Sequence, residues 1–222
     1  MQRSPRGRKF SYSKVLFLLC ASFFPQVHAQ YGTQSGDWAS YGGDTGSTKY
    51  SPLEQITPLN FEELEVAWTW TSIDADLNLD SIQEINEAVR INNFQGTPLK
   101  VGNRLFIITA LNQVAALNPI TGETLWSFNP EVYMSGSPIN YIGYHNRGLA
   151  YWTDGEKERI LAGLNDGYLL SLDATTGQPD PSFAGGKIDL AEGLPRATRD
   201  DLDWTGAQPV AVVSPPIVVG DI

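Results

Sequence analysis

The chain has 222 residues, of which 41% are hydrophobic and 18% are charged, and its formal net charge is −10. This composition predicts a folded domain and excludes a disordered chain, because there is enough apolar surface to form a core. The negative charge argues against nucleic acid as a partner, since the phosphate backbone would be repelled.

Residues 1–29 have the layout of a signal peptide. This stretch holds five basic residues and no acidic ones, followed by an apolar run over 15–24 and by small side chains at Val27 and Ala29. These are the features that the export machinery and signal peptidase recognise. We therefore expect cleavage before Gln30 and export of a body spanning 30–222. An uncleaved membrane anchor is the alternative for the apolar run.

The expected body is more acidic than the whole chain and contains no cysteine. Its 10 basic and 25 acidic residues give a net charge near −15. Cys20, in the leader, is the only cysteine of the chain, and His145 is the only histidine of the body. Disulfides, zinc-thiolate sites and multi-histidine metal sites are therefore excluded within these residues.

The first part of the body is rich in turns and contains a short predicted helix. Glycine and aspartate over 36–58 suit chain reversals. Asn60 and Glu63 have the spacing of a capping box, which predicts a helix that turns Phe61 and Leu64 inward.

The next segments alternate between strand and helix patterns. Residues 66–71 alternate apolar and polar side chains, which predicts a strand. Residues 73–93 break this alternation. Ser81 and Glu84 form a second candidate capping box there, so we expect a helical excursion, with an irregular loop as the alternative.

From residue 97 onward the pattern predicts short strands joined by tight turns. The four expected strands span 98–101, 105–109, 113–118 and 124–128. Four short antiparallel strands in so few residues are typical of one blade of a β-propeller.

The blade pattern recurs along the chain. Residues 116–123 correspond to 171–178 at a constant offset of 55 residues, and residues 215–220 resemble 97–102. Because the third unit stops where its hairpin should turn, we expect an N-terminal fragment. The fold class is therefore all-β: the first two to three blades of a propeller, with short helical excursions.

Three segments resemble the PQQ-dependent (quinoprotein) dehydrogenases, in which PQQ is pyrroloquinoline quinone. Residues 116–126 resemble the family repeat A-x-D-x-x-T-G-x-x-x-W, with Asn118 as the one departure, and Pro181 replaces tryptophan in the second copy. Residues 36–44 together with 50–57 look like the N-terminal signature of these enzymes, and 146–152 are similar to their N-R-G-L/V-A-Y-W segment. The likeness is strongest to the glucose and alcohol dehydrogenase branch.

This resemblance implies an eight-bladed propeller that oxidises a sugar, polyol or alcohol by hydride transfer to PQQ. It also implies a Ca²⁺ ion that polarises the quinone, a catalytic aspartate, a quinone or cytochrome as electron acceptor, and a periplasmic location with membrane association left open. The catalytic aspartate and the Ca²⁺ ligands are expected beyond residue 222, so the chain alone is expected to be inactive. A non-catalytic propeller that acts as an outer-membrane assembly scaffold is the alternative.

The resemblance assigns three candidate cofactor residues in this chain. Arg147 matches the arginine that contacts PQQ, with a structural role at the strand ends as its alternative. Gln95 stands where relatives carry a glutamate that hydrogen-bonds PQQ, and Ser214 lies near a threonine position that the closest register assigns to Val212. His145 is expected to be a hydrogen-bonded loop residue rather than a base. Asp166 and Asp173 are expected to be turn residues.

Overall fold

The fold consists of two four-stranded antiparallel sheets, each built as a meander. The computed structural model describes residues 33, 36–44, 46–91, 93–135, 143–194 and 210–220, so the expected signal peptide lies outside the described residues. The first sheet, or first blade, has the order β1 (Leu99–Val101), β2 (Arg104–Ile108), β3 (Val114–Leu117) and β4 (Thr124–Phe128). The second blade has the order β5 (Ala150–Thr153), β6 (Glu158–Gly163), β7 (Tyr168–Asp173) and β8 (Lys187–Asp189).

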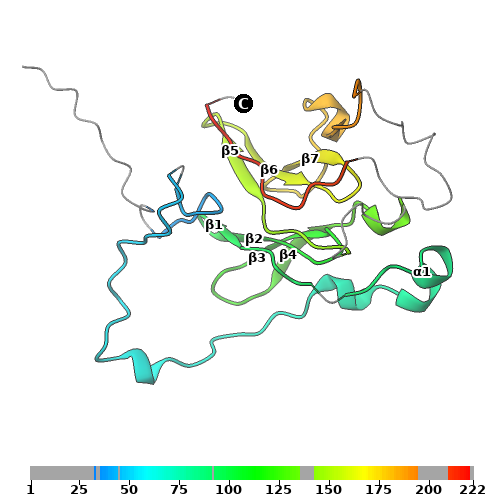
Figure 1. The fold of residues 1–222 in the computed structure, drawn as a ribbon. Coiled ribbons are helices and arrows are strands. Elements are labelled where there is room, and N and C mark those ends of the chain that lie inside the picture. Colours follow the sequence, from blue (N-terminus) through cyan, green and yellow to red (C-terminus); the bar gives the residue numbers. More distant parts are fainter. Residues whose placement is uncertain are drawn as a thin grey trace, which may run out of the picture.

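The two blades lie next to each other (Figure 1), and a continuous apolar core fills the space between them. Phe106 and Ile108 of β2 are fully buried and share this core with Ile160 and Leu172 of the second blade. The predicted propeller blades are confirmed. Each of the four strands expected in the first blade begins and ends within one residue of its predicted bounds.

The helical segments are short and lie outside the sheets. They are η1 (Phe61–Glu63), η2 (Ile73–Asp76), α1 (Leu79–Ile85), η3 (Val132–Met134) and η4 (Ala184–Gly186). None of the helices in the described part of the chain is long and apolar enough to cross a membrane.

Both predicted capping boxes are wrong. The Asn60 side chain accepts a hydrogen bond from the Thr57 amide, 2.7 Å away, instead of capping η1. Phe61 and Leu64 do not face inward, because they are 65% and 53% exposed. Helix α1 is capped by Asn78, whose Oδ1 accepts from the amide of Ser81, so Ser81 lies inside the helix.

Two predicted strands are not formed by the described residues. Segments 66–71 and 215–220 have no strand partner there, and a strand needs a neighbour for its backbone hydrogen bonds. Segment 66–71 nevertheless packs on the first blade, where Trp68 and Trp70 lie against Leu117 and its neighbours.

Tryptophan rings dock successive units at one end of the sheets. The Trp68 indole N–H donates to the carbonyl of Pro119, and the Trp126 indole N–H donates to the carbonyl of Ala174, both at 3.2 Å. Each ring also covers a glycine of the turn that it meets, Gly122 and Gly177 respectively. Trp126 thus packs between the two blades, and Trp68 makes the same contact one unit earlier.

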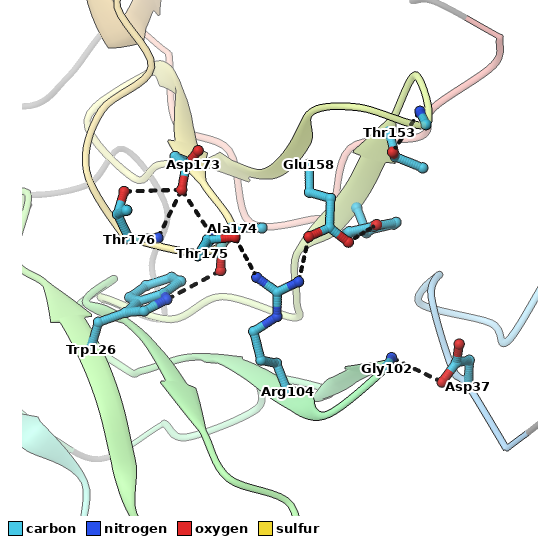
Figure 2. Close-up of polar contacts among 12 residues, drawn as sticks. Asp37, Gly102, Arg104, Trp126, Thr153, Glu158, Asp173, Ala174, Thr175 and Thr176 are labelled. Atoms are coloured by element: carbon cyan, nitrogen blue, oxygen red, sulfur yellow. Dashed lines mark hydrogen bonds and ion pairs between the residues drawn. The ribbon is translucent and has the colours of Figure 1, made fainter.

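An ion pair supports the same junction between blades. Figure 2 shows the Arg104 guanidinium reaching from β2 to the carboxylate of Glu158 on β6 and to the Thr175 hydroxyl, beside Trp126. In the adjoining turn, Asp173 accepts hydrogen bonds from the amides of Thr175 and Thr176. We call this end of the sheets, which carries the turns 118–123 and 173–178, the clamp end.

Candidate functional site

The three candidate residues lie in three successive units: Gln95 before β1, Arg147 before β5, and Ser214 before segment 215–220, which forms no strand among the described residues. The segments that carry them, here called lead segments, are hydrogen-bonded side by side. The Thr97 amide donates to the carbonyl of Arg147 at 2.8 Å, and the Arg147 amide donates to the carbonyl of Val213 at 3.1 Å. Because the strands of a meander alternate in direction, the lead segments lie at the end opposite the clamp end. We call it the site end.

A cavity of about 420 Å³ opens beside the lead segments and contains two of the three candidates. Arg147 and Ser214 both line it. Its other walls come from the turn over 39–47, from the start of β5 and from 215–218. Gln95 is exposed and does not line the cavity, although it lies two residues before Thr97, the direct backbone partner of Arg147.

The backbone around Arg147 is held by its neighbours. Asn146 is buried, its Nδ2 donates to the carbonyl of Gly163 at 2.6 Å, and its Oδ1 accepts from the amide of Gly148 at 3.1 Å. A side chain at Gly148 would crowd the site, since a Cβ there would lie 3.3 Å from the Thr97 carbonyl oxygen and 3.4 Å from the ring of Tyr41.

Arg147 is exposed, although its amide and its carbonyl are both hydrogen-bonded to the neighbouring lead segments. In the described part of the chain, the three ion pairs belong to Lys100, Arg104 and Arg159, and no carboxylate pairs with Arg147. An arginine without a protein anion beside an apolar-walled cavity is suited to bind an anionic ligand.

Tyr151 forms part of the cavity wall and stays protonated at neutral pH. Its hydroxyl donates to Glu158 at 2.5 Å, and burial, together with this contact, raises the pKa of Tyr151 to about 12. The hydroxyl of Tyr151 and then the guanidinium of Arg104 lower the pKa of Glu158. Tyr151 is therefore a wall of the site and a hydrogen-bond donor, and it is not a general base.

The remaining titratable candidates are structural, as expected. His145 is buried, its amide donates to Asn165, and its Nδ1 lies 3.0 Å from the carbonyl of Gly143. Asp166 lies within the turn between β6 and β7, and Asp173 ends β7 just before the turn 174–176. Among the described residues, no group of three or more histidine, cysteine, aspartate or glutamate side chains could hold a metal ion. The position of a catalytic aspartate and of Ca²⁺ ligands stays a prediction.

Sequence reasoning missed Tyr41 and Tyr151 as cavity walls and Asn165 as a link between the blades. Asn165 had a visible signal, because Leu111-Asn112 and Leu164-Asn165 both stand just before the third strand of their repeat. The two tyrosines had none, since their approach depends on how the blades pack.

The sequence matches the PQQ family described as glucose/ethanol/alcohol dehydrogenase, beta-propeller domain, over residues 38–222. It is 30% identical over 182 residues to quinoprotein glucose dehydrogenase A of Acinetobacter calcoaceticus, covering 75% of this chain and 22% of that protein. It is 31% identical to the glycerol dehydrogenase large subunit of Gluconobacter thailandicus, covering 79% and 23%. The chain therefore spans less than a quarter of the length of these relatives.

A solved structure has the same fold over this part. The quinohemoprotein alcohol dehydrogenase from Comamonas testosteroni superposes with a TM-score of 0.53 at 24% sequence identity, covering 74% of this chain and 21% of that one.

Proposed function

The chain belongs to the family of glucose/ethanol/alcohol dehydrogenase β-propellers, and on that basis we propose that the protein oxidises a sugar, polyol or alcohol with PQQ as cofactor. The relatives support this range, since they are named as glucose, glycerol and alcohol dehydrogenases. The non-catalytic scaffold is not favoured, because these curated relatives are dehydrogenases.

Arg147 is the residue that carries the proposal. PQQ has three carboxylates, and a body of net charge near −15 needs a fixed cation to hold them. The guanidinium of Arg147 has no anionic partner among the described residues and lines a cavity of about 420 Å³ together with Ser214. These residues fit a flat, polyanionic cofactor. Arg147 would pair with a carboxylate, and Ser214 would donate a hydrogen bond.

The contribution of this chain to the reaction is to bind and orient. PQQ, when bound, supplies the two-electron acceptor for the hydride of the alcohol. Residues 215–218 supply an apolar wall against which the cofactor rings would pack, and Tyr151 offers a neutral surface because its hydroxyl stays protonated and directed at Glu158. Gln95, at the neighbouring lead segment, is proposed as a polar contact at the rim.

Several further features are proposed from the family and the leader alone. A Ca²⁺ ion and a catalytic aspartate complete the site, and the electron acceptor is a quinone or a cytochrome. One relative, the 1-butanol dehydrogenase of Thauera butanivorans, carries cytochrome c in its name, which supports the second class. The proposed location is the periplasm, supported by the layout of residues 1–29.

Removal of the Arg147 side chain tests the cofactor site. Arg147 is exposed in the protein without cofactor, and PQQ would cover its guanidinium on binding. Truncating one member of a charged pair that is buried in the complex costs about 2–5 kcal/mol, so Arg147→Ala in the full-length protein should weaken PQQ binding by about 30- to 5,000-fold. Arg147→Lys should restore part of the loss, because an ammonium lacks the planar fork of guanidinium. Calorimetric titration of the apo-protein with PQQ measures both.

Arg159 provides the matched control. Its guanidinium already has a protein anion, Asp180, at 2.5 Å, and it does not line the cavity. Arg159→Ala should lower thermal stability and leave PQQ affinity unchanged. Unchanged PQQ affinity in Arg147→Ala would overturn the proposed site.

A further inference from the structure

A buried pair of asparagines joins the two blades at the site end. Asn112 lies in the turn between β2 and β3, and Asn165 lies in the turn between β6 and β7. The Asn165 amide donates to Oδ1 of Asn112 at 2.8 Å, and Nδ2 of Asn112 donates to Oδ1 of Asn165 at 3.2 Å. Both residues are 1% exposed or less, so these hydrogen bonds are shielded from water.

Asn165 also reaches two lead segments at once. Its Oδ1 accepts a second hydrogen bond from the His145 amide at 3.0 Å, and its Nδ2 donates to the carbonyl of Val212 at 2.9 Å. His145 lies two residues before Arg147, and Val212 lies two residues before Ser214. Both lone pairs of Oδ1 are therefore used. The Asn165 side chain anchors the lead segments of both cavity-lining candidates, in each case two residues before the candidate.

The segment that carries Ser214 has few other attachments. Within the described residues, three hydrogen bonds join 210–220 to the rest of the protein: those of the Val212 amide to Leu164, of the Arg147 amide to Val213, and of Asn165 to Val212. Because this segment has no strand partner among those residues, the loss of one bond in three should let it shift.

We infer that Asn165 is a positioning residue that sets the placement of Arg147 relative to Ser214, and so the shape of the cofactor site. This inference rests on the proposed function. Asn165 does not line the cavity, so it acts through the backbone of the two lead segments. Asn112 of the first blade holds Asn165 in place through two hydrogen bonds. The geometry of the site therefore depends on how the two blades are joined.

A double-mutant cycle on PQQ binding tests the inference. The apo forms of the full-length wild type, Asn165→Ala, Arg147→Ala and the double variant are titrated with PQQ by calorimetry, and their thermal unfolding is followed without PQQ. Asn165→Ala should weaken PQQ binding about tenfold, the effect of one buried hydrogen bond expressed in affinity. In the Arg147→Ala background, the same change should weaken it by less than about threefold, because the group that it positions is gone.

Asn118 serves as the control. Its Oδ1 braces the turn 118–123 at the clamp end through the amides of Ile120 and Thr121. Asn118→Ala should lower the unfolding temperature without changing PQQ affinity. A purely structural role for Asn165 predicts the same behaviour, so the contrast between the two variants separates the two roles.

Each outcome decides a different point. If Arg147→Ala leaves PQQ affinity unchanged, the proposed function fails. If Arg147→Ala weakens binding but Asn165→Ala does not, or weakens it equally in both backgrounds, only the positioning role is overturned. Should Asn165→Ala fail to fold, Asn112→Gly decides, since the backbone of Asn112 has a φ of 64° that suits glycine. Unchanged PQQ affinity in Asn112→Gly would then refute the inference.

Discussion

Replacing Gly177 with alanine tests whether tryptophan docking holds the blades together. The backbone of Gly177 has a φ of 71°, and a Cβ there would lie 2.5 Å from Cδ2 of Trp126. The left-handed backbone costs an L-residue about 1–2 kcal/mol, and the clash adds about 1–3 kcal/mol of overpacking. Gly177→Ala should therefore destabilise the protein by about 2–5 kcal/mol.

Gly102→Ala isolates the contribution of the Trp126 contact. Gly102 also has a positive φ, of 56°, but nothing lies within 4 Å of a Cβ built there. Gly102→Ala should therefore lose only the free energy of placing an L-residue in the left-handed backbone. The effect of alanine on the unfolded chain is the same in both variants and cancels when their stabilities are compared. Urea unfolding of the full-length protein should place Gly177→Ala about 1–3 kcal/mol below Gly102→Ala. Equal stability of the two variants would refute the docking role of Trp126.

Two further predictions concern the ion pair at the clamp end and the leader. The Tyr151 hydroxyl and the Arg104 guanidinium hold the pKa of Glu158 below its ordinary value of 4.5, so its ionisation stabilises the fold above that pH and this contribution is lost as the pH falls through the folded-state pKa. The difference in unfolding temperature between wild type and Glu158→Gln should therefore shrink between about pH 6 and about pH 3, and a constant difference would contradict this account. Cleavage of the leader should leave an N-terminus at Gln30, and an intact Met1 in the mass spectrum of the exported protein would count against it.

Strands of the first blade could be predicted closely because their signals are local. Apolar residues fill β2 and β3, and turn residues such as Gly102 and Gly122, both at positive φ, mark where the chain reverses. A tight turn fixes the register of its own hairpin, so no distant contact is needed to place these strands.

Helix caps and unpaired strands could not be predicted in the same way. Asn60 and Asn78 are alike in sequence, yet only Asn78 caps a helix, because Asn60 instead accepts from Thr57. Segment 66–71 has a strand pattern, but such a pattern indicates only that one face of the segment is buried. It does not show whether another strand lies alongside to pair with it. Trp68 shows what that pattern encodes here, which is docking onto the turn at Gly122.

The candidate site residues could be chosen from the sequence, whereas their arrangement required the structure. Arg147 and Ser214 were identified from a resemblance, and the structure places both at one cavity. Gln95 was chosen on the same grounds and lies outside that cavity, although Thr97, two residues on, donates its amide to the carbonyl of Arg147. Side-chain direction depends on the packing of whole blades, which a motif does not specify.

The two ends of the blades divide stability from binding. Trp68, Trp126 and the Arg104–Glu158 pair meet at the clamp end, whereas Arg147 lies at the other end with an exposed side chain. Removing Arg147 exposes no core and breaks no ion pair of the described residues, so the apo-protein should keep its unfolding temperature. Gly177→Ala should do the reverse. It should lower the unfolding temperature, whereas the folded fraction of the variant should bind PQQ with normal affinity. Asn165 is a buried residue that contributes to both tasks, since it joins the blades and anchors the lead segments. Its variant should therefore lower both stability and affinity, and only the loss of affinity should depend on Arg147.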